Sequence, residues 1–85
     1  MADLPSVTAL AAALAAADAL HDEYERVTLK GVVDMAWAGF YAAFVVGRVG
    51  EFAPASRLAE LFEDVDEADD WPAAAADYVL GKLRS

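Results

Sequence analysis

Residues 32–46, VVDMAWAGFYAAFVV, constrain the fold of this chain more than any other segment, because Asp34 is their only charged residue. A helix so apolar has almost no face to present to water, so other elements must cover nearly all of it. The remaining residues supply three flanking helices that cover part of this surface. A second copy of the chain, a partner protein or a membrane would have to cover the rest.

The length and composition of the chain indicate one small helical domain. Eighty-five residues cannot form two separate cores, so we expect a single domain over residues 1–85. A core of this size contributes only about 3–5 kcal/mol of net stability. No cysteine is present, which excludes disulfides, iron–sulfur clusters and thiolate nucleophiles. Apolar residues make up 59% of the chain and many of them are alanine, which favours helices.

The net charge of −9 argues against direct nucleic-acid binding, because six scattered basic residues form no patch that would attract a phosphate backbone. Three interpretations fit the acidity: solubility, adaptation to a salty cytoplasm, or docking on a basic partner. Composition alone does not separate them. The N-terminal residues MADLPSV lack a basic signal-peptide region, so we expect a cytoplasmic location.

The first helix is predicted over residues 6–29, with Ser6 as its N-cap. A stripe of apolar residues recurs along it at spacings of three and four: Val7, Leu10, Leu14, Ala17, Leu20, Tyr24 and Val27. Gly31 marks the predicted break, with Lys30 near the carbonyl end of the helix. Two alternatives stay open here: Thr28 caps the next helix, or VTL and VVD pair as a hairpin around Lys30 and Gly31.

Three further helices are predicted after this break. The second covers residues 32–46 and stops near Gly47 and Gly50. One broad apolar face is expected. Another line along the helix is expected to be the only wetted one, and it consists of Lys30, Asp34, Tyr41 and Arg48. Pro54 is predicted in the first turn of the third helix, with Ser56 as a competing cap. The apolar stripe of this helix is Leu58, Leu61, Phe62 and Val65. Residues 64–70, DVDEADD, form a loop, after which Asp69 or Asp70 caps a last helix with Pro72 in its first turn. The predicted inward face of that helix is Trp71, Ala75, Tyr78, Val79 and Leu83.

The sequence contains no specific signature of catalysis or of metal binding. His21, the only histidine, follows Asp18 at the carboxylate-x-x-His spacing of di-iron bundles, and Glu25 lies one turn beyond. Such a site needs two of these motifs, so only a dimer would complete it, and we interpret His21 as a surface residue. The acidic loop fails the calcium-binding pattern after its third position. No nucleophile and base are spaced as a pair. We therefore expect no enzyme activity, no cofactor and no metal.

An aromatic cluster on the second helix is the best candidate for a functional surface. Its members are Trp37, Phe40, Tyr41 and Phe44. Rings at helical spacing are most often core, but they also form exposed association patches and pockets for small apolar ligands.

The predicted fold is an all-α, compact bundle of four helices, in which two long antiparallel helices are crossed by two short ones. Its predicted core is Trp37, Phe40, Phe44, Leu14, Leu20, Leu61, Phe62 and Tyr78. The function we expect is a non-catalytic protein–protein interaction module that self-associates or joins a larger assembly. The alternatives are a binding protein for a small hydrophobic ligand and an acidic inhibitor or nucleic-acid mimic. The apolar run is too short to span a membrane, so no membrane partner is expected.

Overall fold

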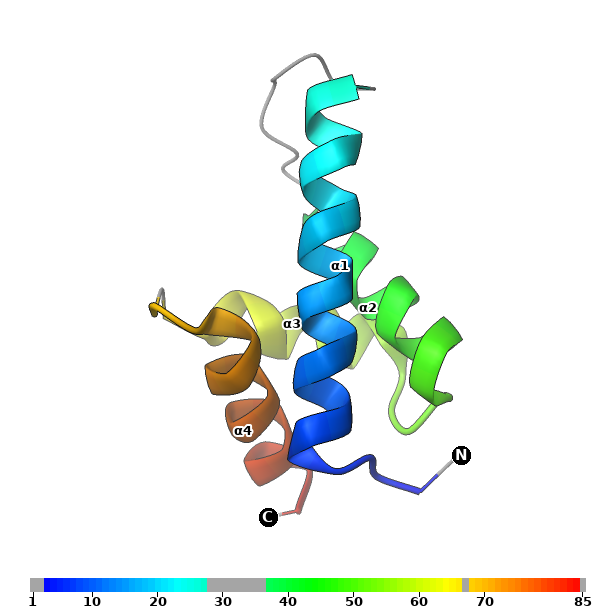
Figure 1. Ribbon diagram of the computed structural model, residues 1–85. Coiled ribbons are helices and arrows are strands. Elements are labelled where there is room, and N and C mark those ends of the chain that lie inside the picture. The colour runs from blue at the N-terminus through cyan, green and yellow to red at the C-terminus, as the bar shows by residue number, and fades with distance from the viewer. Residues whose placement is uncertain (1–2, 28–36, 67, 85) are drawn as a thin grey trace.

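The computed structural model describes residues 3–27, 37–66 and 68–84, and these residues form four α-helices and no strand (Figure 1). The helices are α1 (Val7–Val27), α2 (Trp37–Val49), α3 (Ala55–Asp64) and α4 (Trp71–Arg84). The predicted all-helical fold is confirmed. The predicted break at Gly31, its two alternatives and the start of the second helix lie outside the described residues. No helix in the described ranges is long and apolar enough to cross a membrane.

Polar side chains cap two of the helices, and a proline precedes the first turn of a third. The backbone N–H of Ala9 donates to the hydroxyl of Ser6 at 3.1 Å, which confirms Ser6 as the cap of α1. Asp70 does the same for α4, where its carboxylate accepts from the N–H of Ala73 at 3.3 Å. At α3 the residue before the first turn is Pro54, and no side chain caps the helix. The competing cap at Ser56 was therefore wrong, since Ser56 lies inside the helix.

Gly50 ends α2 by adopting a backbone conformation that other residues avoid. Its φ angle is 95°, and its N–H donates to the carbonyl of Val46 at 3.0 Å. This is a left-handed helix end, for which glycine is favoured because it has no Cβ to clash. The chain then turns, and Phe52 and Ala53 are buried just before α3 begins. The sequence pattern did not predict that these two loop residues belong to the core.

The four helices are arranged in a ring. In the view of Figure 1, α1 stands in front, α3 lies behind, and α2 and α4 lie on either side. Helix α1 packs against α2 and α4, and α3 also packs against both, though less extensively against α4. The described backbones of α2 and α4 do not approach each other closely. The space between these two helices is therefore bridged only by side chains.

The buried stripe of α1 departs from the predicted one in its second half. Leu10, Leu14, Ala17 and His21 are buried, whereas Leu20 is 47% exposed. At 3.6 residues per turn, His21 lies about 20° around the helix from Leu10, and Leu20 about 80° away on the other side. The prediction that Leu20 is core and the interpretation of His21 as a surface residue were therefore both wrong.

Helix α2 is rotated about its own axis relative to the predicted orientation, so a different face is buried. Its buried residues are Ala38, Tyr41, Ala42 and Val45, so Tyr41 does not lie on a wetted line as expected. Trp37, Phe40 and Phe44 were predicted as core and are only half-buried, packed against it. The exposed residues of the helix are instead Arg48 and three small residues, Gly39, Ala43 and Gly47. Because such residues expose little apolar surface, this helix needs less cover than its composition indicates.

The remaining core follows the predicted pattern more closely. Leu14, Leu61 and Phe62 are buried as predicted, whereas Tyr78 is half-buried beside the core. On α4 the buried residues are Ala75, Ala76, Val79 and Leu80, with Trp71 and Leu83 half-buried at either end. The predicted loop between the third and fourth helices is also confirmed, because α3 ends at Asp64 and α4 starts at Trp71.

Candidate functional site

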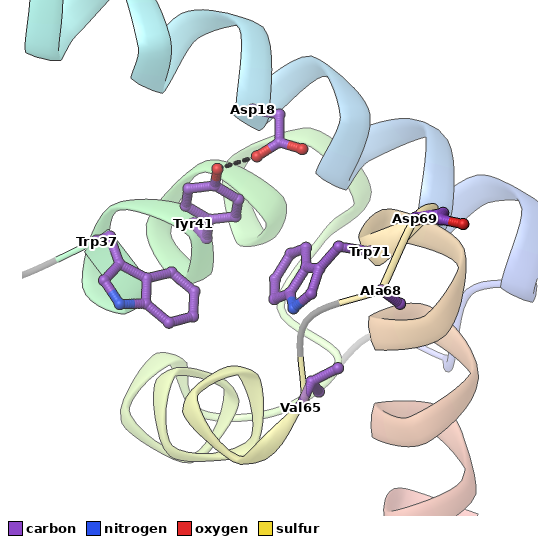
Figure 2. Close-up of a pocket in the computed structure, with 7 residues that line it drawn as sticks. All are labelled: Asp18, Trp37, Tyr41, Val65, Ala68, Asp69 and Trp71. Carbon is purple, nitrogen blue, oxygen red and sulfur yellow. Dashed lines mark hydrogen bonds between the residues drawn. The ribbon is translucent and has the colours of Figure 1, made fainter.

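An open hollow of about 670 Å³ lies where α2 and α4 fail to meet. Figure 2 shows that α1 contributes Asp18 on one side, α2 contributes two aromatic rings, and the loop before α4 contributes the opposite rim. The described residues that line it are Asp18, Trp37, Tyr41, Val65, Ala68, Asp69 and Trp71.

Three aromatic rings form one wall of the hollow and fix each other in place. Their centroids are 5.5 Å apart for Trp37 and Tyr41, 5.6 Å for Tyr41 and Trp71, and 5.7 Å for Trp37 and Trp71. Each pair is edge-to-face, with interplanar angles of 89°, 89° and 77°. Such contacts stabilise by about 0.5–1.5 kcal/mol per pair beyond the area they bury. The wall is therefore preorganised by the protein itself.

Local sequence places these rings. Trp37 and Tyr41 are four residues apart on α2, so they project from the same side of the helix. Trp71 is the first residue of α4, where the Asp70 cap fixes the start of the helix. Behind it lies the buried ring of Phe62, with its centroid 6.2 Å away. The short loop between α3 and α4 thus carries Trp71 across to the rings of α2.

Asp18 ties the aromatic wall to α1. Its carboxylate accepts a hydrogen bond from the hydroxyl of Tyr41, a residue that is only 6% exposed (Figure 2). Asp18 itself is half-buried. A hydrogen bond to a charged group is stronger than one between neutral groups, so this contact fixes the tilt of the phenol ring.

A second aromatic cluster backs Tyr41 on the side of His21. The His21 ring lies 5.1 Å from Phe40 and 5.3 Å from Tyr41, and Phe40 stacks on Tyr24 at 5.8 Å. The histidine is therefore an aromatic packing residue on α1. Within the described residues no group of three or more His, Asp or Glu side chains could hold a metal ion. The side chain of Glu25, the third member of the metal-binding pattern that the sequence analysis did not adopt, is not among those that the structure describes.

The structure separates the four aromatic residues predicted as an interaction surface. Trp37 and Tyr41 line the hollow, whereas Phe40 packs on His21 and Tyr24. Phe44 is half-buried, and the guanidinium of Arg48 lies 6.0 Å from its ring centroid. The predicted group is thus divided between a recessed wall and the packing of the α1–α2 interface.

Sequence reasoning missed the contribution of Trp71 and Asp18 to this site. Trp71 was predicted only as part of an inward helix face, and Asp18 was considered only in the metal-binding pattern with His21, which we did not adopt. Their spacing from Trp37 and Tyr41 along the chain follows no motif. Trp71 and Asp18 meet the rings of α2 only because the four helices are arranged in a ring, and no local sequence pattern predicts that arrangement.

The described lining offers carboxylates, one phenol, indole N–H groups and aromatic surface. This set can hold a ligand by stacking, by cation–π contact and by charge. Comparisons of the chain with protein-family models, with curated proteins and with solved structures find no match.

Proposed function

We propose that this protein is a non-catalytic binding module that takes its ligand in the hollow between α2 and α4. The observation that supports this most directly is the preorganised wall of Trp37, Tyr41 and Trp71 beside a hollow of about 670 Å³. Ligand sites in proteins typically measure about 300–1,000 Å³ and combine aromatic walls with a few polar groups.

The partial exposure of the two tryptophans supports recognition as well as packing. Tryptophan is highly buried on average, although so large a side chain is rarely covered completely. Trp37 and Trp71 instead remain half-buried at the hollow, while smaller residues such as Val45 and Val79 are completely buried. A ligand that fills the hollow would cover the ring surface that the fold leaves open.

The intrinsic fluorescence of the protein tests this proposal, because Trp37 and Trp71 are the only tryptophans in the chain and both line the hollow. Three compounds of nearly equal shape serve as probes: para-tert-butylbenzyl alcohol, para-tert-butylbenzoate and para-trimethylammonio-benzyl alcohol. We expect at least one of them to shift the emission along a saturable curve.

Matched variants locate the binding. Ala68→Leu fills the hollow from its rim, whereas Ala43→Leu adds the same bulk to the outward face of α2. We expect Ala68→Leu to abolish the response and Ala43→Leu to leave it unchanged. A response absent for all three compounds, both in emission and in ligand-observed NMR, would refute the proposal.

Self-association is a second proposal, favoured by the exposed apolar pair on α1. Leu20 is 47% exposed and Tyr24 37% exposed, and the two lie one helical turn apart on α1. Light scattering at low and at high salt tests it. A dimer that Leu20→Ser converts to a monomer would support this interface, and a wild-type monomer at both salt concentrations would exclude it. The cytoplasmic location and the lack of enzyme activity stay predictions.

A further inference from the structure

We propose that the ligand of the hollow is an organic cation, an ammonium group carried on an apolar body. This inference rests on the proposed function and adds the chemical class of the ligand. Three features of the hollow support this ligand class: the charges that surround it, its aromatic wall and the position of Asp18.

The hollow is acidic and has no basic counter-charge among the described residues that line it. Asp18 and Asp69 are the charged members of that lining, and the end of α3 and the loop that follows it add exposed Asp64, Asp66 and Asp70. The five basic residues that the structure describes lie elsewhere: Arg26, Arg48, Arg57, Lys82 and Arg84. An anionic ligand would therefore be repelled, and a cation attracted, before any contact is made.

Three of those basic side chains already have partners away from the hollow. The Arg57 guanidinium lies 3.6 Å from the Glu60 carboxylate, and Arg48 lies over the ring of Phe44. The ammonium of Lys82 lies 5.6 Å from the ring centroid of Tyr78. In the described part of the chain, acidic side chains thus lie near the aromatic wall of the hollow, and no basic side chain lines it.

The wall itself suits an alkylated ammonium group. Aromatic faces attract cations through the ring quadrupole, tryptophan most strongly, and several rings meeting at one site form the cages that bind quaternary ammonium ligands. Trp37, Tyr41 and Trp71 meet nearly at right angles in every pair. A rounded group such as trimethylammonium would contact the ring surface that these edge-to-face contacts leave open toward the hollow.

Asp18 is the carboxylate placed to balance the ligand charge. One of its oxygens accepts from Tyr41, and Figure 2 shows the other pointing away from that hydroxyl. A carboxylate has about four acceptor positions, so a single hydrogen bond leaves capacity for an ammonium group. The carboxylate of Asp69 points away from the rings in the same view.

The test compares para-trimethylammonio-benzyl alcohol with para-tert-butylbenzyl alcohol, which differ only in having a charged nitrogen in place of a carbon. The neutral compound is the more hydrophobic of the two, so a site that binds only through apolar contacts would prefer it. We expect the cation to bind about tenfold more tightly, as judged from tryptophan emission at low salt. Equal or tighter binding of the neutral compound would overturn the inference.

Charge-removing variants assign the effect to Asp18. Asp18→Asn keeps an oxygen that accepts from Tyr41 and removes the charge, so we expect cation affinity to fall about three- to fivefold. Asp77→Asn makes the same change on an exposed part of α4 outside the hollow and should leave affinity unchanged. Equal affinity of the Asp18→Asn and wild-type proteins for the cation would count against this role.

The two proposals fail in different ways. If none of the three probes binds, the hollow is not a ligand site and the proposed function is wrong. If the neutral alcohol or the benzoate binds at least as tightly as the cation, the hollow binds ligands but the inferred charge class is wrong.

Discussion

Replacing Tyr41 by phenylalanine tests the link between α1 and α2 with minimal change of shape. The substitution removes only the hydroxyl that donates to Asp18 and keeps the ring that contacts Trp37, Trp71 and His21. Tyr41 is 6% exposed, so most of its side chain is covered by other parts of the protein.

The expected loss follows from the environment of the two partners. A hydrogen bond to a charged group contributes about 1.5–3 kcal/mol to stability. Asp18 is half-buried, so water can partly replace the lost donor, and we expect the lower end, about 1.5 kcal/mol. For a domain of this size that corresponds to a fall of about 6–12 °C in Tm.

Urea unfolding followed by circular dichroism measures the effect. The matched control is Tyr78→Phe, because Tyr78 is half-buried on α4 and its ring contact with Lys82 does not need the hydroxyl. We expect the control to cost less than about 0.5 kcal/mol. In a double-mutant cycle with Asp18→Ala, the two changes should couple by about 1 kcal/mol. Equal losses in Tyr41→Phe and Tyr78→Phe, or a coupling near zero, would refute the reasoning.

Five further substitutions probe the fold, each compared with wild type by urea unfolding. Gly50→Ala should destabilise by about 1 kcal/mol because φ is 95° there, whereas Gly47→Ala should stabilise by about 0.5–1 kcal/mol because an added Cβ meets no atom within 4 Å. Leu14→Ala should cost about 2–5 kcal/mol as a cavity in the core, and Leu20→Ala less than about 1 kcal/mol because Leu20 is 47% exposed. Asp70→Ala should cost about 1 kcal/mol by removing the α4 cap. Equal effects within either matched pair, or a fully stable Asp70→Ala protein, would contradict these assignments.

The features that the sequence predicted correctly are local ones. Ser6 and Asp70 cap their helices because a short polar side chain reaches the N–H groups of the first turn without help from the rest of the fold. The stripe of α3 was also predictable, because its buried residues Leu58, Leu61 and Phe62 contrast with charged residues between them. In such a helix the pattern alone decides which face turns inward.

The sequence did not predict which face of α2 turns toward the core, because this helix lacks the contrast between apolar and charged residues that marks α3. Its described residues are apolar or small except Arg48, so no charge contrast marks an outer face. Packing then decides: alanines such as Ala38 and Ala42 are buried, which allows neighbouring backbones to approach closely, while Trp37 stays half-buried at the hollow. The hollow depends on that orientation, so the sequence pattern did not predict that its lining residues lie close together.

The packing of α1 against α4 has a consequence for the order in which the protein is made. Helix α1 leaves the ribosome first, but one of its flanks is covered only by α4, whose first residue follows Val7 by more than sixty positions. At about 5–20 residues per second, the nascent chain waits roughly 3–13 s for that partner. During this interval the apolar side of α1 is a target for chaperones, and synthesis interrupted before Trp71 leaves it uncovered.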